Sequence, residues 1–453
     1  MDEALAAVTR AVTWASNLVW GPWTIALLLG TGLFLTLRYR FIQLRRLPEA
    51  LRLLRGGRVG AGAGALSPFQ AFMTGLGASV GTGNIAGVAT AIVTGGPGAV
   101  FWIWCYGFFA TTIKLTEAML AVRFRSAKAE RLSTGPMHYL EQGIGSRKLG
   151  LLYAAVAGVA ALTTTPFTQP NSVAVVFHSE LGVPTWVVGV AIAILVWAVT
   201  IGGVKSVGRV ASRLAPTMVT LYLVGGLVVI VAFAGRIPET LALIFREAFS
   251  MKAAAGGGVG VGMMVAMRYG LARGIYANEA GYGTAAVAYG TAQTDRPARQ
   301  GLNAMVEVYI VSFVTSTISA MTVLLSGEWA TSGLKSTALV AKAFSTVIPY
   351  GGLLVMLCVL LFGTSCMIGW GYYGEQFLHY VFGDRVVMPY RWIYAGLAIV
   401  GATRSVDLVW AWGDLMNGLQ IFPNLIGVLG LSGLVAKMLR EDEARKWGQS
   451  PFS

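Results

Sequence analysis

Long apolar stretches separated by short polar loops run the whole length of the chain. An α-helix needs about twenty apolar residues to cross the hydrocarbon layer of a bilayer, and repeated stretches approach that length. The pattern therefore predicts eleven membrane-spanning helices, at residues 17–37, 66–93, 97–122, 149–180, 184–202, 212–234, 253–290, 301–325, 352–378, 388–403 and 418–438.

The second of these spans is interrupted at its centre by the small and polar residues from Ala78 to Gly87. A break exposed to lipid would leave backbone groups unpaired, so such breaks survive where they line a cavity or bind something. Close helix packing is the alternative, because Gly77/Gly81 and the pair six residues further on have small-xxx-small spacing. On this stretch alone the two interpretations stand level.

The seventh span repeats the anomaly. Glycines at 256–258 open it, and polar and charged residues from Arg273 to Gly281 interrupt its centre. The two interrupted spans lie five spans apart, so they cross the membrane in opposite directions and predict an inverted repeat. Paired broken helices in inverted halves are typical of secondary transporters, whose substrate and coupling ion bind between the half-helices. The second break therefore favours a binding site over simple packing.

Composition and charge agree with a polytopic membrane protein. Hydrophobic residues make up 55% of the 453 positions and charged residues 12%, which excludes a soluble globular domain. Most of the basic residues behind the net charge of +14 fall in alternate loops, above all 38–58 and 123–148. By the positive-inside rule these loops face the cytoplasm. The prediction is a multi-pass protein of the inner or plasma membrane with the N-terminus outside and the C-terminus cytoplasmic, and the charge requires no nucleic-acid partner.

The expected organisation follows the two repeats. Residues 1–65 form an N-terminal transmembrane helix with a cytoplasmic amphipathic segment, and residues 66–235 form the first five-helix repeat. Residues 236–252 form an outer amphipathic connector, residues 253–439 the second, inverted five-helix repeat, and residues 440–453 a cytoplasmic tail. We expect a monomer whose partners are its substrate and the lipid bilayer.

Specific motifs accompany the breaks. Residues 81–89 read GTGNIAGVA, 95–102 read GGPGAVFW and 278–281 read NEAG, and shorter matches follow at 135–137, 168–169, 171–172, 273–274, 299–301 and 423–424. With these motifs in this order, the chain resembles the alanine/glycine:cation symporter family, also called sodium:alanine symporters. The resemblance covers nearly the whole chain. It implies a leucine-transporter-type core of five plus five inverted helices with one extra N-terminal helix.

The resemblance also implies a function and a site. It implies import of a small neutral amino acid, alanine or glycine, by alternating access in symport with Na⁺, and no enzymatic activity. The substrate would meet the backbone amides of the first break and a small pocket, formed by Thr82, Gly83, Asn84, Gln169, Tyr276 and Trp370. The coupling Na⁺ would be held by backbone carbonyls and hydroxyls of Gly77, Val80, Leu361, Thr364 and Ser365. Considered without the family, the two hydroxyls can equally bond back to the preceding helical turn.

Three positions depart from the family pattern. Val311 stands where an acidic residue is usual, Ala277 follows Tyr276 where the family has Phe-Ser, and Gln420 lies close before the Pro423-Asn424 motif. These departures leave the substrate and the ion open, and the alternative is a proton-coupled or different-substrate transporter of the same fold. A channel is a weaker alternative because polar residues concentrate at the two breaks, and no acid/base or metal set indicates an intramembrane enzyme.

Charged residues inside the spans are costly and default to functional hypotheses. Lys114 and Glu117 lie three residues apart and share one helix face, so they can pair. Glu279 is expected to partner Arg273 or Lys114. For all four residues a structural or gating role is favoured over direct contact with substrate or ion.

Overall fold

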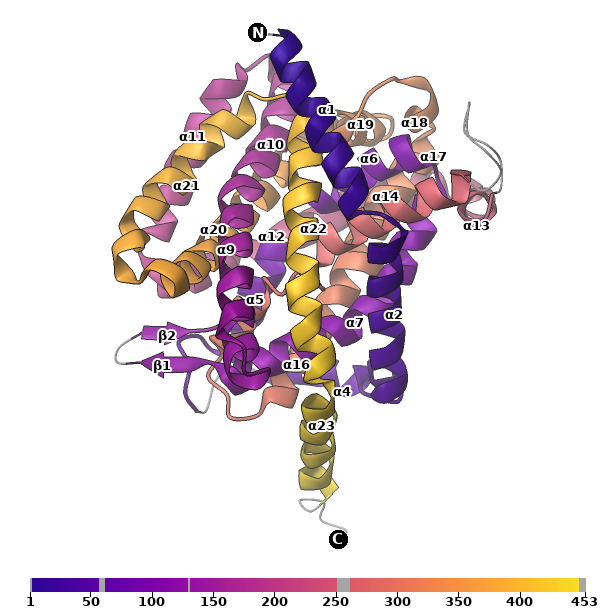
Figure 1. Ribbon diagram of the computed structural model, residues 1–453. Helices are drawn as coiled ribbons and strands as arrows, with labels where there is room; N and C mark the ends of the chain where they lie inside the picture. The colour runs from indigo at the N-terminus through magenta and orange to yellow at the C-terminus, as the bar shows by residue number, and fades with distance from the viewer. Residues whose placement is uncertain (1, 57–61, 129–130, 251–260, 448–453) are drawn as a thin grey trace.

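The computed structural model describes residues 2–56, 62–128, 131–250 and 261–447, which form a bundle of helices (Figure 1). Within these residues the only strands are β1 (Ser126–Lys128) and β2 (Arg131–Ser133), an antiparallel pair in which Ala127 faces Leu132. The predicted all-α polytopic class is confirmed, with this small hairpin as an addition.

The longest helices form the spans of the bundle. They are α7 (Ala99–Phe124), α9 (Arg147–Thr163) followed by α10 (Thr165–Leu181), α12 (Gly203–Ala232), α16 (Pro297–Val308) joined to α17 (Ser316–Ser326) by the π-helix η4 (Tyr309–Thr315), and α20 (Gly351–Phe382). Among the described residues, five helical stretches are long and apolar enough to cross a membrane, or up to eight if each bent pair is one span.

Three bent pairs account for the difference. Helices α1 (Asp2–Val19) and α2 (Pro22–Arg38) meet at 42°, α5 (Pro68–Ser79) and the stretch that ends with α6 (Ala86–Gly95) at 55°, and α22 (Val406–Gly430) and α23 (Ser432–Trp447) at 53°. The first bend comes where Pro22 starts a new helix, because proline has no N–H to continue the preceding one. The predicted bounds 17–37 and 418–438 are therefore wrong, since each range crosses a bend.

Shorter elements complete the chain. The α-helices are α3 (Ile42–Arg45), α4 (Leu47–Gly56), α8 (Pro136–His138), α11 (Thr185–Thr200), α13 (Ile237–Ala248), α14 (Val261–Asn278), α15 (Ala286–Gly290), α18 (Glu328–Thr331), α19 (Ser336–Ser345) and α21 (Val387–Ala402). The 3₁₀-helices are η1 (Thr82–Asn84), η3 (Ala234–Arg236) and η5 (Asp384–Val386), and η2 (Tyr139–Gly143) is a second π-helix. The predicted seventh span begins at 253, and residues 253–260 lie outside the described residues.

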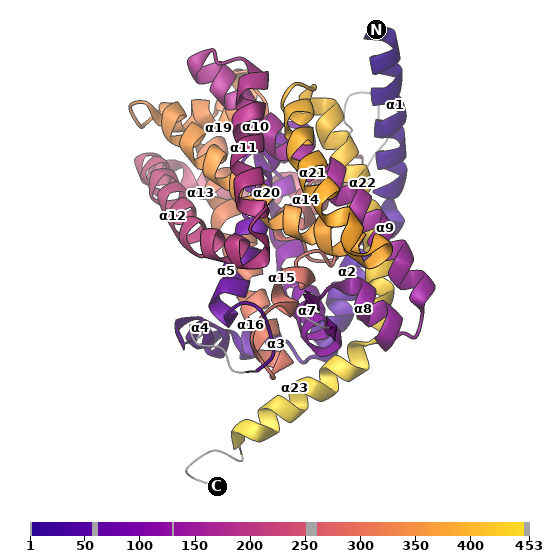
Figure 2. The same ribbon diagram turned by 90° about the vertical axis from the view of Figure 1, so that its left-hand side faces the viewer.

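The two ends of the bundle differ in character. Helix α4, the β1–β2 hairpin and α23 gather at one end, while the N-terminus, α18 and α19 lie at the other (Figure 1). Figure 2 shows α4 and α23 together at the first of these ends in a second view. The arginine-rich loops thus share an end with the C-terminal helix, as the charge pattern requires. Inside the bundle, α7 packs against α14 and α16, and α20 packs against α5, α9, α10 and α12. These central helices surround the two breaks.

Candidate functional site

The first break is a real interruption of the backbone. Helix α5 ends at Ser79, η1 follows, and α6 begins at Ala86. Asn84 braces the break, because its Nδ2 donates to the Ser79 carbonyl at 2.9 Å while its own carbonyl accepts a hydrogen bond from Ser319 Oγ at 2.6 Å. The Asn84 side chain therefore ties the break to its own backbone, and the Asn84 backbone carbonyl ties it to α17.

The second break starts later than its sequence pattern indicates. Residues from Arg273 to Asn278 are still helical, and the irregular segment begins at Glu279, whose φ of 55° is uncommon for a residue with a side chain. The Asn278 Oδ1 accepts from the Ala280 N–H at 3.0 Å, and Glu117 Oε1 accepts from the Gly281 N–H at 2.8 Å. Side chains thus take up backbone groups that the helix leaves free.

A small cavity lies between the two breaks. Its volume is about 10 Å³, on the order of the space needed for one water. The lining residues are Ala78, Ser79, Gly81, Gly83, Thr165, Gln169, Tyr276, Glu279, Cys366, Trp370 and Asn417. Four predicted substrate residues, at positions 83, 169, 276 and 370, are thus brought together, and the Asn84 side chain turns away as described above. The remaining lining residues were not predicted to contact the substrate, and three of them, Thr165, Cys366 and Asn417, look like ordinary helix residues in the sequence.

Two residues of the first break, Thr82 and Gly83, contact side chains that line the cavity. The Thr82 N–H donates to Gln169 Oε1 at 2.9 Å, so this predicted carboxylate-binding amide faces the side chain of α10. A Cβ at Gly83 would lie 2.6 Å from the Tyr276 ring, which only glycine avoids. Tyr276 is in turn hydrogen-bonded to Thr168 through their hydroxyls at 2.5 Å.

The predicted cation ligands include two unusual hydroxyls. Thr364 Oγ1 and Ser365 Oγ are buried in α20, and neither has a hydrogen-bond partner among the described residues. They do not bond back to the preceding turn, which was the alternative explanation. Ser365 Oγ lies 2.7 Å from the position of a Cβ at Gly77, so α20 and α5 touch here, and Val80 leaves α5 with a non-helical ψ of 75°. Buried hydroxyls without partners are costly unless a ligand completes them.

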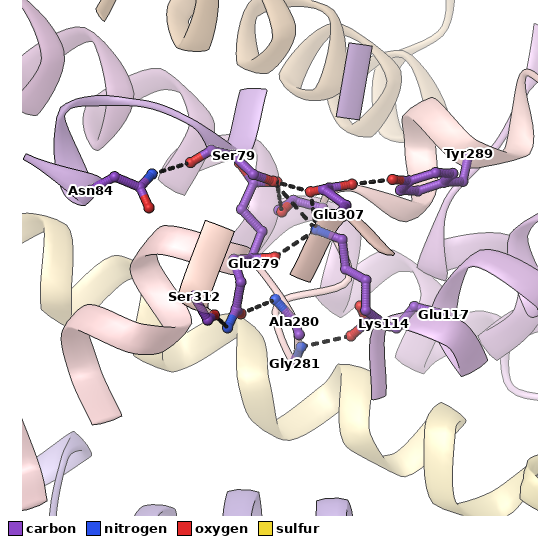
Figure 3. Close-up of polar contacts among 12 residues, drawn as sticks. Ser79, Asn84, Lys114, Glu117, Glu279, Ala280, Gly281, Tyr289, Glu307 and Ser312 are labelled. Atoms are coloured by element: carbon purple, nitrogen blue, oxygen red, sulfur yellow. Dashed lines mark hydrogen bonds and ion pairs between the residues drawn. The ribbon is translucent and has the colours of Figure 1, made fainter. Parts of the chain in front are cut away.

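The buried charges pair differently from the prediction. Lys114 Nζ contacts Glu307 Oε1 at 2.9 Å, and Glu117 Oε1 accepts a hydrogen bond from the Gly281 N–H of the second break (Figure 3). Glu117 also accepts a hydrogen bond from Asn424 Nδ2 at 2.6 Å. The direct ion pair of Lys114 is therefore with Glu307, and not with Glu117 as their spacing on α7 allows. Glu307, one residue before the end of α16, places its carboxylate directly against the ammonium.

Arg273 and Glu279 also have other partners. Arg273 pairs with Asp414 of α22 at 2.5 Å, and its guanidinium lies 4.6 Å from the Trp410 ring centre. Glu279 accepts hydrogen bonds from Trp370 Nε1 at 2.5 Å and from a threonine hydroxyl of its own loop at 3.1 Å. Among the described residues Glu279 makes no direct ion pair with Arg273 or Lys114, so an expected direct contact between them is wrong. Asp414 was missed because the last span was placed to start after it.

Comparisons with known proteins agree with this architecture. The profile of the "Sodium:alanine symporter family" matches residues 5–451. The chain is 39% identical to the sodium/alanine symporter AgcS of Methanococcus maripaludis, covering 96% of this chain and 97% of the relative. It is 34% identical to the probable sodium/glutamine symporter GlnT of Bacillus subtilis, covering 96% and 91%.

The fold is shared more widely. The crystal structure of MhsT in complex with L-phenylalanine superposes with a TM-score of 0.57 at 14% identity, covering 83% of this chain and 99% of that one. This likeness confirms a leucine-transporter-type fold. The family is one of transporters, so the expectation that the protein is not an enzyme is confirmed. Both the motifs and the full-length match lead to one conclusion: the chain belongs to the sodium:alanine symporter family.

Proposed function

We propose that the protein imports a small neutral amino acid, alanine or glycine, together with Na⁺ across the cell membrane. The observation that carries the proposal is the small buried cavity between two broken helices, beside two buried hydroxyls that have no hydrogen-bond partner in the described part of the chain. A cavity with the volume of about one water holds no amino acid as it stands. The pocket must open for any substrate, so the position of the cavity at the two breaks, and not its volume, supports the proposal.

The carboxylate of the substrate would bind at the first break. The Thr82 N–H is now held by the Gln169 side-chain oxygen, which occupies the position that a carboxylate oxygen would take. Backbone N–H groups at a helix start favour anions. When the substrate enters, its carboxylate oxygen would therefore replace Gln169 Oε1 as the acceptor of the Thr82 N–H. The displaced Gln169 side chain could then donate a hydrogen bond from its amide group to the substrate.

The sodium ion would bind between α5 and α20. Thr364 and Ser365 supply hydroxyl oxygens, and Gly77, Val80 and Leu361 supply carbonyls, the ligand types that bind Na⁺ at unwound helices. An ion held there joins α5 to α20 and fixes the shape of the break. Because the same break carries the Thr82 amide, ion binding and substrate binding are coupled.

Arg273 and Asp414 would form a gate on the side facing outward. Their ion pair joins α14 to α22, and the adjoining rings of Tyr276 and Trp410 lie 5.1 Å apart. With the predicted orientation, α14 enters from the outside, so this layer covers the cavity from that face. Opening it would admit substrate, and closing it would allow release to the cytoplasm.

Uptake by the purified protein in proteoliposomes tests the proposal. We expect radiolabelled alanine to accumulate only with an inward Na⁺ gradient, and to stop accumulating when an ionophore collapses that gradient. An inward proton gradient in Na⁺-free buffer serves as the comparison. Accumulation driven by protons alone would contradict sodium coupling and favour the alternative ion.

Glutamine is a second candidate substrate, because one relative of this chain is named a probable sodium/glutamine symporter. The tight contact between Gly83 and Tyr276 argues for the smaller side chains. Competition of labelled alanine uptake by unlabelled glycine, alanine and glutamine separates these substrates. Stronger competition by glutamine than by glycine would overturn the size argument.

A further inference from the structure

The Lys114 ammonium lies between the two broken helices (Figure 3). Its Nζ is 2.6 Å from the Asn278 carbonyl oxygen, 2.9 Å from Glu307 Oε1 and 3.3 Å from Ser79 Oγ. Ser79 is the last residue of α5 and Asn278 the last residue of α14. One ammonium on α7 therefore binds the ends of both interrupted helices and a carboxylate of α16.

The oxygen cage around this ammonium is itself fixed. Glu307 accepts hydrogen bonds from Ser79 Oγ at 2.5 Å and from the Tyr289 hydroxyl. The side chains of Lys114 and Glu307 are 1% and 0% exposed, so both charges depend on each other for compensation. A carbonyl at the C-terminal end of a half-helix is a Na⁺ ligand in broken-helix transporters, and here a carboxylate and a hydroxyl lie beside it.

We propose that the Lys114 ammonium is a tethered cation that fills a second cation cage, so that transport couples one Na⁺ per amino acid. The inference rests on the proposed function. The hydroxyls of Thr364 and Ser365 have no partner among the described residues and remain for the exchangeable ion. Lys114 is covalently held on α7, so it carries its positive charge between the breaks throughout the cycle and is never transported.

The accumulation ratio measures the number of ions directly. In proteoliposomes clamped at zero membrane potential with equal K⁺ and valinomycin, a roughly tenfold Na⁺ gradient supports roughly tenfold alanine accumulation with one ion and roughly a hundredfold with two. We expect the one-ion ratio for the wild-type protein. A ratio near a hundredfold would overturn the inference.

Substitutions at Lys114 test the cage itself. Lys114→Ala leaves the oxygens of Glu307, Asn278 and Ser79 facing an open space, which we expect a second Na⁺ to enter. The rate of uptake should then become second order in Na⁺, and the accumulation ratio should rise towards a hundredfold. Lys114→Arg keeps the charge and should retain the one-ion ratio. In the double variant Lys114→Ala with Glu307→Gln the carboxylate is lost, and the second ion should be lost with it.

The outcomes separate the inference from the function on which it rests. Active Lys114→Ala protein that still couples one ion would overturn the cage. If that variant does not fold, the wild-type ratio decides: one ion supports the inference and two overturn it. Alanine uptake that ignores the Na⁺ gradient would contradict the proposed function before any ratio is measured.

Discussion

The two unpartnered hydroxyls of α20 allow a prediction in which one substitution has opposite effects with and without sodium. Thr364→Val keeps the shape of the side chain and removes Oγ1, and Ser365→Ala removes Oγ. In the absence of Na⁺ each hydroxyl is buried with no partner from residues 2–56, 62–128, 131–250 or 261–447, a state that costs about 1–3 kcal/mol. Both variants should therefore be as stable as the wild type in Na⁺-free buffer, or more stable.

In the presence of Na⁺ the same substitutions remove a ligand. An interaction with a charged group contributes about 1.5–3 kcal/mol, and each 1.4 kcal/mol corresponds to about a tenfold change in affinity. The Na⁺ affinity should thus fall by roughly ten- to a hundredfold in each variant. The stabilising effect of Na⁺ on thermal unfolding should need correspondingly higher concentrations, because that effect follows the ratio of ligand concentration to Kd.

The assay is a titration of the unfolding temperature of detergent-purified protein against NaCl at constant ionic strength, with choline as the replacement cation. Thr200→Val is the matched control, because Thr200 is also buried in a membrane helix but its Oγ1 bonds back to the Val196 carbonyl at 2.8 Å. The control should leave the Na⁺ dependence unchanged. An unchanged Na⁺ affinity in both α20 variants would refute the assignment of the cation site.

Three further substitutions test other parts of the site. Gly83→Ala places a methyl group 2.6 Å from the Tyr276 ring, an overlap that should cost about 1–3 kcal/mol and reduce alanine uptake, whereas Gly396→Ala, with nothing within 4 Å of its new methyl group, should leave uptake intact. Asp414→Asn removes the charged partner of Arg273, which should destabilise the closed gate by up to about 3–5 kcal/mol. In a background whose only cysteine is Cys366, an impermeant thiol reagent added outside should label Cys366 faster in this variant than in the protein with Asp414, and equal labelling rates would contradict the gate. Trp370→Phe deletes the hydrogen-bond donor to the Glu279 carboxylate and should lower the free energy of unfolding by about 1.5–3 kcal/mol. The loss should exceed that of Trp102→Phe, because the Trp102 indole donates to the neutral Ala248 carbonyl. Equal losses would mean that the hydrogen bond to the carboxylate contributes no more than one to a neutral carbonyl.

Local pattern predicts much of this fold because each span must satisfy its own backbone within the membrane. The glycine-rich first break was found at Gly81 to Gly83 for that reason, and the structure interrupts the helix there. The second break was placed too early, at Arg273. A charged residue lowers the local hydropathy as much as a broken backbone does, so the two cannot be separated without knowing where the partner of Arg273 lies.

The end of the chain was misplaced for the same physical reason. Helix α22 starts at Val406, whereas the predicted span starts at 418. Asp407, Asp414 and Asn417 lower the hydropathy of the first half of this helix. In the bundle Asp414 faces Arg273, and its charge is compensated inside the protein. A hydropathy average counts the full free-energy cost of each charged residue as if it stood alone. Inside the bundle, a charge that is paired with an opposite charge costs much less than an unpaired one.

The pairing of Lys114 shows what sequence spacing cannot provide. Glu117 is three residues away on the same helix, yet the Lys114 ammonium forms its ion pair with Glu307, which lies far along the chain. Glu117 instead accepts hydrogen bonds from the N–H groups of Asn424 and Gly281. An i,i+3 pair contributes only about 0.2–0.5 kcal/mol on a solvated helix. A buried ammonium needs several oxygens at once, and only the meeting of α5, α14 and α16 provides them. The residues nearest in sequence were therefore the wrong guide, and the partner of a buried charge has to be sought where the two broken helices converge.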